Sequence, residues 1–350
     1  MPPKRERKII QSKLSVSLFL LVLCILAYGL LIPTLGFYWD DWPYAWINHM
    51  FGPQGYPDYV ALDRPHSAWI FMGLTAILGE QPMGYHFSAL LIFCLCGVLF
   101  WYLLRSLWPG HKKEALWASM LFVVYPGFLG HPQAIIYNHH FIAMALYLLS
   151  LIGLVQAIKA QIKAGLAWRV IAWHLPSLGA LLLSQFSIEY FLGWEAIRLN
   201  VVWIAINQED LDLDRRVGWG LLHMIPYWLA TLSFLLWRVF IFEFPTYQPF
   251  GGGETAFVFH EWVSDILTQI VETVFYAWAR AFPHLSPGEF SRPFWLVYLA
   301  LIGLTSTIVF LMLLFYRHNK TGDQKGIPSR EPSFGRSALF MALIGIAFAG

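Results

Sequence analysis

Charged side chains are scarce in this sequence. Asp, Glu, Lys and Arg together make up 13% of its 350 residues, about half the share that is usual in soluble domains. Apolar residues make up 58%, and a soluble fold of this length needs far more polar surface, so a water-soluble enzyme is excluded. The formal net charge of +2 is too small to indicate a protein that binds nucleic acid.

Cysteine is nearly absent as well. The three cysteines, Cys24, Cys94 and Cys96, all lie within apolar runs, and their spacing matches neither a disulfide framework nor a metal site. We therefore expect these thiols to be buried as small hydrophobic groups.

The sequence contains many long apolar runs instead. A bilayer core about 30 Å thick is crossed by roughly 20 apolar residues in a helix. We predict an all-α polytopic membrane protein, a single transmembrane domain over residues 1–350 with at least eight transmembrane helices. The predicted spans lie near residues 14–33, 82–104, 115–129, 135–157, 170–185, 190–206, 217–240 and 294–316, and a partial one lies at 337–350.

The distribution of basic residues predicts the orientation of these spans. Most of the 23 Lys and Arg residues fall in segments that the spans place on one side, together with the amino terminus. The positive-inside rule puts that side in the cytoplasm. The first outer loop is then 34–81 and the long outer loop is 241–293. This pattern favours a multi-pass protein of the bacterial cytoplasmic (inner) membrane.

Both outer loops contain a segment that is typical of an interfacial helix. Residues 66–79 are apolar but would form a helix only about 21 Å long, too short to cross. Residues 257–282 alternate polar and apolar side chains at helical spacing, with Glu261 and Asp265 on one face and Trp262 and Ile266 beside them. We expect both to lie on the outer membrane face.

Two adjacent carboxylates, Asp40 and Asp41, stand just after the first span between Trp39 and Trp42. Carboxylates near a low-dielectric boundary can act as general bases, and a pair of them can also bind a divalent cation. The alternative is a solvated loop within an aromatic belt.

Arg64 is the only Lys or Arg of loop 34–81. A guanidinium there could hold an anion such as a phosphate, or it could pair with Asp63 or a lipid headgroup.

Later segments add further candidates. Glu189 follows the fifth span near the outer surface and could contact sugar or acceptor hydroxyls. Arg280 ends the polar stripe of the long outer loop and could contact a phosphate. Glu195 and Arg198 lie within a predicted span, where a charge suggests function, although residues three apart can also neutralise each other.

The pattern Asp40-Asp41-x-x-Tyr44-Ala45, followed by Arg64-Pro65-x-x-x-Trp69, resembles the membrane glycosyltransferases of the C-type superfamily. The nearest branch is the protein O-mannosyltransferase and aminoarabinose transferase type, whose members move a sugar from a polyprenyl-phosphate carrier to an acceptor at the outer membrane face. The resemblance covers about the first 110 residues. It implies that Asp40 is the catalytic base, that Asp41 supports it or binds metal, and that Arg64 faces the carrier phosphate.

A second outer loop, predicted near residues 130–134, departs from this family. Members often have a further acidic residue there, whereas this chain has His131, His139 and His140 and no carboxylate. Either these histidines serve the phosphate, or the metal and donor arrangement differs. A metal site at the histidines is the weaker interpretation, because their spacing matches no helical ligand pair.

The expected partners are a polyprenyl-phosphate-linked sugar donor, an acceptor glycan, lipid or protein, and membrane lipids. The acidic pair suggests a divalent cation as the cofactor. A polysaccharide polymerase or ligase of cell-envelope glycan assembly is the alternative, and it would depend on Arg280, His284 and Arg292. A transporter would need repeats or charged, broken helices, for which only Glu195 and Arg198 argue. A purely structural membrane subunit is a further alternative.

Overall fold

The computed structural model describes residues 4–127, 131–165, 168–208, 211–243 and 259–277, together with isolated positions between 293 and 310. Within these residues the chain forms helices, turns and bends and no strand. The all-α prediction is therefore confirmed for the part of the chain that the structure describes.

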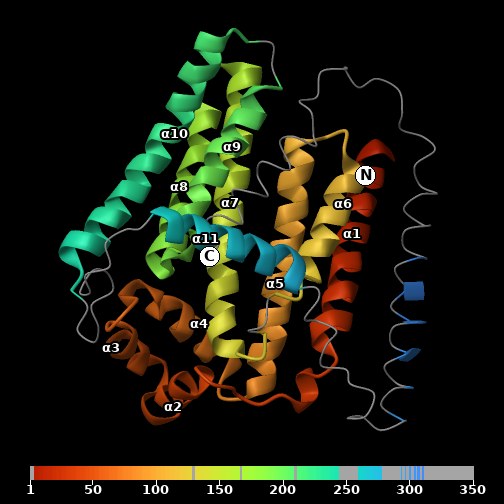
Figure 1. Ribbon diagram of the computed structural model, residues 1–350, viewed down its shortest axis with the longest axis vertical. Coiled ribbons are helices and arrows are strands. Elements are labelled where there is room, and N and C mark those ends of the chain that lie inside the picture. The colour runs from red at the N-terminus through yellow and green to blue at the C-terminus, as the bar shows by residue number, and fades with distance from the viewer. Residues whose placement is uncertain are drawn as a thin grey trace.

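Long helices run alongside one another, and short ones gather at one end of the bundle (Figure 1). The bundle consists of the long helices α1 (Lys4–Cys24), α5 (Pro82–Leu107), α7 (Ala134–Ala164), α8 (Trp168–Ser187) and α10 (Leu213–Leu236), together with the shorter α6 (Lys112–Val123) and α9 (Glu195–Ile206). The short ones at that end are α2 (Asp41–Phe51), α3 (Tyr56–Val60) and α4 (Ala68–Leu78). We refer to this part as the α2–α4 end.

Several short 3₁₀- and π-helical segments connect or extend these elements. They are η1 (Ile25–Gly29), η2 (Ile32–Thr34), η3 (Gly52–Gly55), η4 (Pro65–Ser67), η5 (Glu189–Trp194) and η6 (Trp237–Ile241). Later in the chain, α11 (Phe259–Val271) continues into η7 (Glu272–Tyr276). The hydroxyl of Tyr125, just after α6, donates a hydrogen bond to the carbonyl of Thr273 in η7 at 2.9 Å.

Five helical segments of the described residues are long and apolar enough to cross a membrane. They are Leu14–Thr34, Pro82–Leu107, Ala134–Lys163, Trp168–Ser187 and Leu213–Ile241, and each matches a predicted span. By length and composition the chain is therefore a helical membrane protein.

The expectation of eight spans is not confirmed. Helices α6 and α9 have 12 residues each, about 18 Å, which is shorter than a bilayer core. Pro126 follows α6 and disfavours a helical conformation at the residue before it, while η5 replaces the first turn of the helix predicted at 190–206. Most of 294–316 and all of 337–350 lie outside the described residues.

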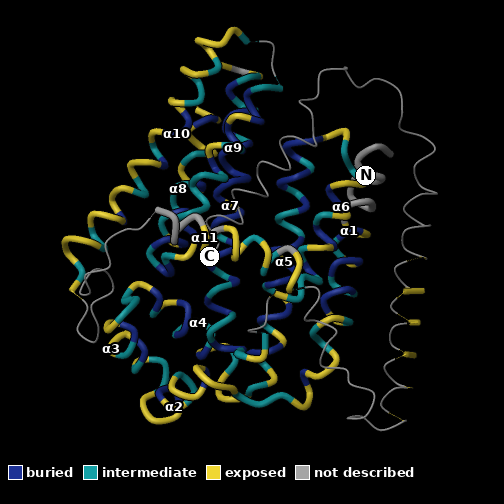
Figure 2. Tube along the Cα trace, in the orientation of Figure 1, coloured by how far each residue is buried: buried dark blue, intermediate teal, exposed yellow. Residues whose placement is uncertain are grey.

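Helix α7 lies at the centre of the bundle. In an apolar stretch of 18 residues within α7, 78% of the residues are buried, whereas in the corresponding stretch of α10 only 17% are buried (Figure 2). Small residues allow its neighbours to come close: a Cβ atom on Gly153 would lie 2.7 Å from Cβ of Ser177 in α8. A Cβ on Gly97 of α5 would likewise lie 2.4 Å from Val123 of α6. Close backbone approach through small residues is the usual way in which apolar helices associate in membranes.

The α2–α4 end has a small core of its own. Ile47, Tyr56, Val60 and Phe71 pack there against the first turns of α5 and α7. The tyrosine hydroxyl is satisfied inside this core, because Tyr56 donates to the carbonyl of Tyr44 at 3.1 Å and accepts from Thr75 at 3.0 Å. This packing fixes α2, α3 and α4 on the ends of the long helices. Helix α4 lies where residues 66–79 were expected to form a short apolar helix.

Candidate functional site

The two adjacent carboxylates differ in burial. Trp39, just before them, has a φ of 45°, in the left-handed region that a residue with a side chain rarely adopts. Asp40 follows at the N-cap position of α2. Its side chain is exposed and makes no capping hydrogen bond to the helix. Asp41, in the first turn of α2, is completely buried. The pair therefore has two different roles in the fold.

Asp41 caps a helix that begins far away in the sequence. Its Oδ1 accepts hydrogen bonds from the backbone N–H groups of Ile135 at 2.8 Å and Ile136 at 3.1 Å, in the first turn of α7. Those N–H groups have no partner within their own helix, and a carboxylate there also interacts favourably with the helix dipole. Burial nevertheless raises the pKa of Asp41 to about 6, because the loss of water outweighs these hydrogen bonds.

Asp40 lies on a cavity of about 550 Å³ at the α2–α4 end. Three separate parts of the chain meet there, and we call it the Asp40 cavity. Its walls are Asp40, Pro43, Tyr44, Tyr59, Val60, Leu62, Asp63, Arg64, Ser67, Gln133, Ile136, Tyr137, His139, His140 and Tyr190. Two carboxylates, a guanidinium, two imidazoles and four phenols thus surround one space.

Arg64 is held in this wall by two carboxylates. Its Nε and Nη2 donate to the two oxygens of Glu189 at 3.1 and 2.6 Å, and its Nη1 donates to Asp63 at 2.6 Å. Burial alone would lower the pKa of Arg64, but the hydrogen bonds and charges of Glu189 and Asp63 raise it. Arg238 of η6 adds a second cation, since its Nη1 donates to the carbonyl of Asp63 at 2.6 Å.

The two histidines of the wall have defined tautomers, because each ring donates to a carbonyl. Nε2 of His139 donates to the carbonyl of Ser187 at 3.0 Å, and Nδ1 of His140 donates to that of Ile136 at 2.8 Å. The second nitrogen of a neutral His140 is then a hydrogen-bond acceptor. His140 also lies between two phenol rings, with centroid distances of 5.2 Å to Tyr137 and 5.4 Å to Tyr190.

Tyr59 is linked electrostatically to Asp40. Burial, together with the negative charge of Asp40, raises the pKa of the Tyr59 phenol. Burial also raises the pKa of Tyr44, whose ring centroid lies 5.1 Å from that of Tyr59. Both phenols therefore stay protonated and can donate hydrogen bonds in the cavity.

The other predicted site residues lie elsewhere. His131 stacks on Tyr28 with a centroid distance of 3.8 Å and contacts Phe93 and Phe141, so it belongs to an aromatic cluster rather than to the wall of the Asp40 cavity. Burial lowers the pKa of His131 to about 4, which keeps the ring neutral. Asp41 is not part of the cavity wall either. Arg280 lies outside the described residues, as do His284 and Arg292.

No group of three or more His, Cys, Asp or Glu side chains in the described residues is arranged to hold a metal ion. The divalent cation suggested by the acidic pair therefore has no site formed by such side chains there. Asp40 is exposed, whereas Asp41 is buried and accepts hydrogen bonds from the first turn of α7, so the two carboxylates have different surroundings.

Sequence reasoning named Asp40, Arg64, His139 and Glu189 as site residues, and all four lie at or beside the Asp40 cavity, but it missed the tyrosines. Tyr44 was noted only as part of a motif, and Tyr59 and Tyr190 carry no spacing signal of their own. Arg238 lies 175 residues from its partner Asp63, so only the fold reveals the pair. The proximity of Arg64 and Glu189, 125 residues apart, is likewise a tertiary result.

Comparison with known proteins identifies no relative of this chain. No protein-family model matches the chain, and no curated protein or solved structure is significantly similar to it.

Proposed function

We propose that this protein is an integral membrane glycosyltransferase, which moves a sugar from a polyprenyl-phosphate carrier to an acceptor hydroxyl. One observation carries the proposal: the exposed carboxylate of Asp40 and the guanidinium of Arg64 line the same cavity. In this proposal the α2–α4 end faces the outer side of a bacterial inner membrane and the amino terminus is cytoplasmic, as the distribution of basic residues predicts.

The reaction needs a base on the acceptor. The acceptor oxygen forms a bond to the anomeric carbon while the bond from that carbon to the carrier phosphate breaks, and the hydroxyl proton must leave. Asp40 suits this role because its carboxylate has no hydrogen bond to its helix and is open to the cavity. A general base contributes about 10²- to 10⁴-fold to such a rate.

The reaction also needs positive charge on the leaving phosphate. Arg64 uses three of its N–H groups on Glu189 and Asp63, and a guanidinium has five, so two are left for phosphate oxygens. The phenols of Tyr59 and Tyr44 add neutral donors at the same cavity. Preorganised donors of this kind stabilise charge that develops in the transition state. Glu189, in turn, orients Arg64 and can accept a hydrogen bond from a sugar hydroxyl.

The proposal is tested by transfer assays on the purified protein in lipid nanodiscs. The donors are labelled polyprenyl-phosphate mannose, glucose and aminoarabinose, and the acceptors are glycans, lipids and proteins of a bacterial cell envelope. We expect transfer from one donor, reduced about 10²-fold or more in Asp40→Asn. Glu80→Gln is the matched control, because that carboxylate is exposed at the same end, pairs with His49 and lies outside the cavity wall.

Two outcomes would contradict the proposal. Transfer from none of the donors, by protein that retains its thermal unfolding transition, removes the glycosyltransferase function. Full activity of Asp40→Asn together with loss in Arg280→Ala would favour the polymerase or ligase instead.

A further inference from the structure

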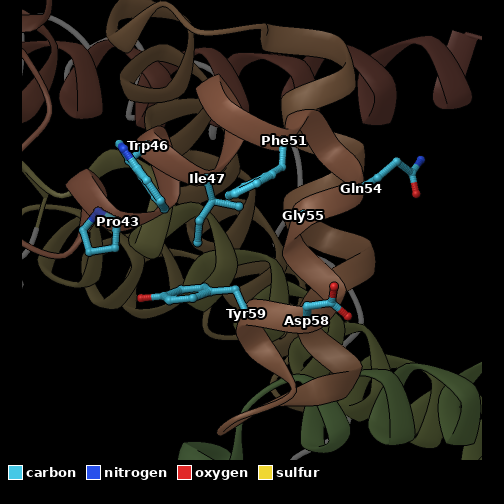
Figure 3. Close-up of a pocket in the computed structure, with 8 residues that line it drawn as sticks. All are labelled: Pro43, Trp46, Ile47, Phe51, Gln54, Gly55, Asp58 and Tyr59. Carbon is cyan, nitrogen blue, oxygen red and sulfur yellow. The ribbon is translucent and has the colours of Figure 1, made fainter.

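A second hollow lies beside the Asp40 cavity. It has a volume of about 670 Å³ and lies between α2, η3 and α3, as Figure 3 shows. We call it the Trp46 groove. It is lined by Pro43, Trp46, Ile47, Phe51, Gln54, Gly55, Asp58 and Tyr59. Volumes of about 300–1,000 Å³ are typical of sites for small ligands.

The groove combines exposed aromatic rings with polar groups. The exposed fractions are 57% for Trp46 and 60% for Phe51, and their rings meet edge to face at 5.8 Å. Asp58 and Gln54 are exposed on the other side of the groove. A sugar ring has an apolar C–H face, which stacks on an aromatic ring, and hydroxyl groups at its edge, which donate to a carboxylate or an amide. The groove therefore offers a sugar both aromatic rings for stacking and polar side chains for hydrogen bonds.

The charge of the groove favours a neutral ligand. Its wall contains one carboxylate, Asp58, and no Lys or Arg. An anionic lipid headgroup or an acidic glycan would meet that negative charge without a cation to offset it. The hydroxyl groups of a neutral sugar instead donate hydrogen bonds to Asp58.

The groove and the Asp40 cavity share a wall. Pro43 and Tyr59 line both, and Asp40 stands one helical turn before Pro43, at the start of α2. A ligand in the groove could therefore extend past Tyr59 and present a hydroxyl to the carboxylate of Asp40.

A glycine shapes the floor of the groove. A Cβ atom on Gly55 would lie 2.7 Å from Cβ of Phe51 and 2.9 Å from Cγ2 of Ile47. Any larger residue would push η3 away from α2. The close approach of these two elements therefore depends on the absence of a side chain at position 55.

We propose that the Trp46 groove binds the acceptor, a neutral oligosaccharide, and directs one of its hydroxyl groups to Asp40. This inference rests on the proposed glycosyltransferase function and narrows its acceptor from glycan, lipid or protein to a saccharide. Trp46 and Phe51 supply stacking surfaces, Asp58 and Gln54 bind hydroxyl groups, and Tyr59 lies at the passage to the Asp40 cavity.

Binding is tested separately from transfer. Saturation-transfer NMR on the full chain in nanodiscs uses mannotetraose, maltotetraose and chitotetraose as probes, with no donor present. We expect at least one probe to bind and its affinity to fall about tenfold or more in Trp46→Ala and in Asp58→Asn. Trp42→Ala is the matched control, because that tryptophan is on the same helix and is 60% exposed but lines neither hollow.

The outcomes separate this inference from the function on which it rests. No binding of any probe, or equal binding by Trp46→Ala and Trp42→Ala, overturns the groove assignment, as would occupation of the groove by a lipid chain. Asp40-dependent transfer with an unchanged KM for the acceptor in Trp46→Ala overturns the groove but keeps the glycosyltransferase. Groove-dependent binding of a probe without transfer from any donor keeps the saccharide site and overturns the function.

Discussion

Arg64 and Arg198 are both held by a glutamate, but their surroundings differ. At the α2–α4 end, the side chains of Arg64 and Glu189 are 24% and 29% exposed, and Arg64 lines a cavity. Within the bundle, the side chain of Arg198 is not exposed at all, and that of its partner Glu195 is 12% exposed. The same pair of residue types thus occurs once beside open space and once inside packed helices.

The inner pair is enclosed by other polar groups. Nη1 of Arg198 donates to Oγ of Ser150 at 3.0 Å, and its guanidinium lies over the rings of Tyr147 and Tyr227, 4.9 and 4.5 Å from their centroids. The hydroxyl of Tyr147 donates to Glu195 at 2.8 Å. These contacts join α7, α9 and α10, so the pair connects helices rather than lining a site.

This comparison separates charge that holds the fold from charge that can meet a ligand. A charge inside a membrane bundle suggests function by default, yet neither Glu195 nor Arg198 lines either of the two hollows described above. Removing a partner should therefore affect stability at the inner pair and activity at the outer pair.

The largest loss of stability is expected for Glu195→Ala. It leaves Arg198 buried without its carboxylate, and breaking a buried ion pair from one side costs about 3–5 kcal/mol. The measurement is the free energy of unfolding in detergent micelles by denaturant titration. The double variant Glu195→Leu with Arg198→Met should recover most of the loss, since an apolar pair leaves no buried charge. If the single and the double variants lost the same free energy of unfolding, the unpaired charge of Arg198 would not be the cause of the loss.

Asp41 should come next, because it is as buried as Arg198 but belongs to the α2–α4 end. Asp41→Ala removes the cap of α7, and losing a helix cap costs about 1–2 kcal/mol. Asp41→Asn keeps an acceptor oxygen and should lose less. Unfolding of both variants at pH 7.5 tests this order, and an Asn variant no more stable than the Ala variant would contradict it.

The same residue predicts a pH dependence. The folded pKa of about 6 lies above the usual value of about 4, so the folded state holds this proton more tightly than the unfolded state. The resulting stabilisation is complete below about pH 4 and is lost as the pH rises through about 6. Unfolding free energies at pH 5 and pH 7.5 should therefore differ less in Asp41→Asn than in the unmodified chain. An equal pH difference in the two proteins would contradict the raised pKa.

The class of fold and five of its spans could be predicted from the sequence, because the length of an apolar run directly reflects the thickness of a membrane. The short helix α4 and the amphipathic α11 also lie where residues 66–79 and 257–282 predicted them. The lengths of α6 and α9 could not be predicted, since η5 and the turn before Pro126 interrupt apolar runs that otherwise read as continuous.

The site was only partly accessible from the sequence. The motif assigned Asp40 and Arg64 to one candidate site, and both line the same cavity. It placed Asp41 beside Asp40 in that site as a supporting acid, whereas in the structure Asp40 is exposed and Asp41 is buried, directly after the left-handed backbone of Trp39. The partner of Asp41 is a helix terminus 94 residues away, and no local pattern marks such a contact.

At the outer pair, Glu189→Gln should change stability by no more than about 1 kcal/mol, because partly exposed ion pairs contribute little. It should still reduce transfer, since a side-chain amide has only one acceptor oxygen and cannot hold both N–H groups of Arg64 as the carboxylate of Glu189 does. The two measurements are denaturant unfolding and the transfer assay. A loss of stability as large as that of Glu195→Ala would remove the distinction between the two arginines.

The smallest change in stability is expected for Asp40→Asn, within about 0.5 kcal/mol, as is usual for an exposed residue that makes no special contact. The expectation follows from its exposed side chain and from the absence of a hydrogen bond to α2. Unfolding is measured on the same preparation that is assayed for transfer, with Glu80→Gln as the control. If Asp40 is a general base beside an open cavity, its substitution should lower the rate of transfer and leave the free energy of unfolding unchanged. If Asp40→Asn lost stability and activity together, Asp40 would be part of the scaffold, and the distinction between scaffold and site at the α2–α4 end would fail.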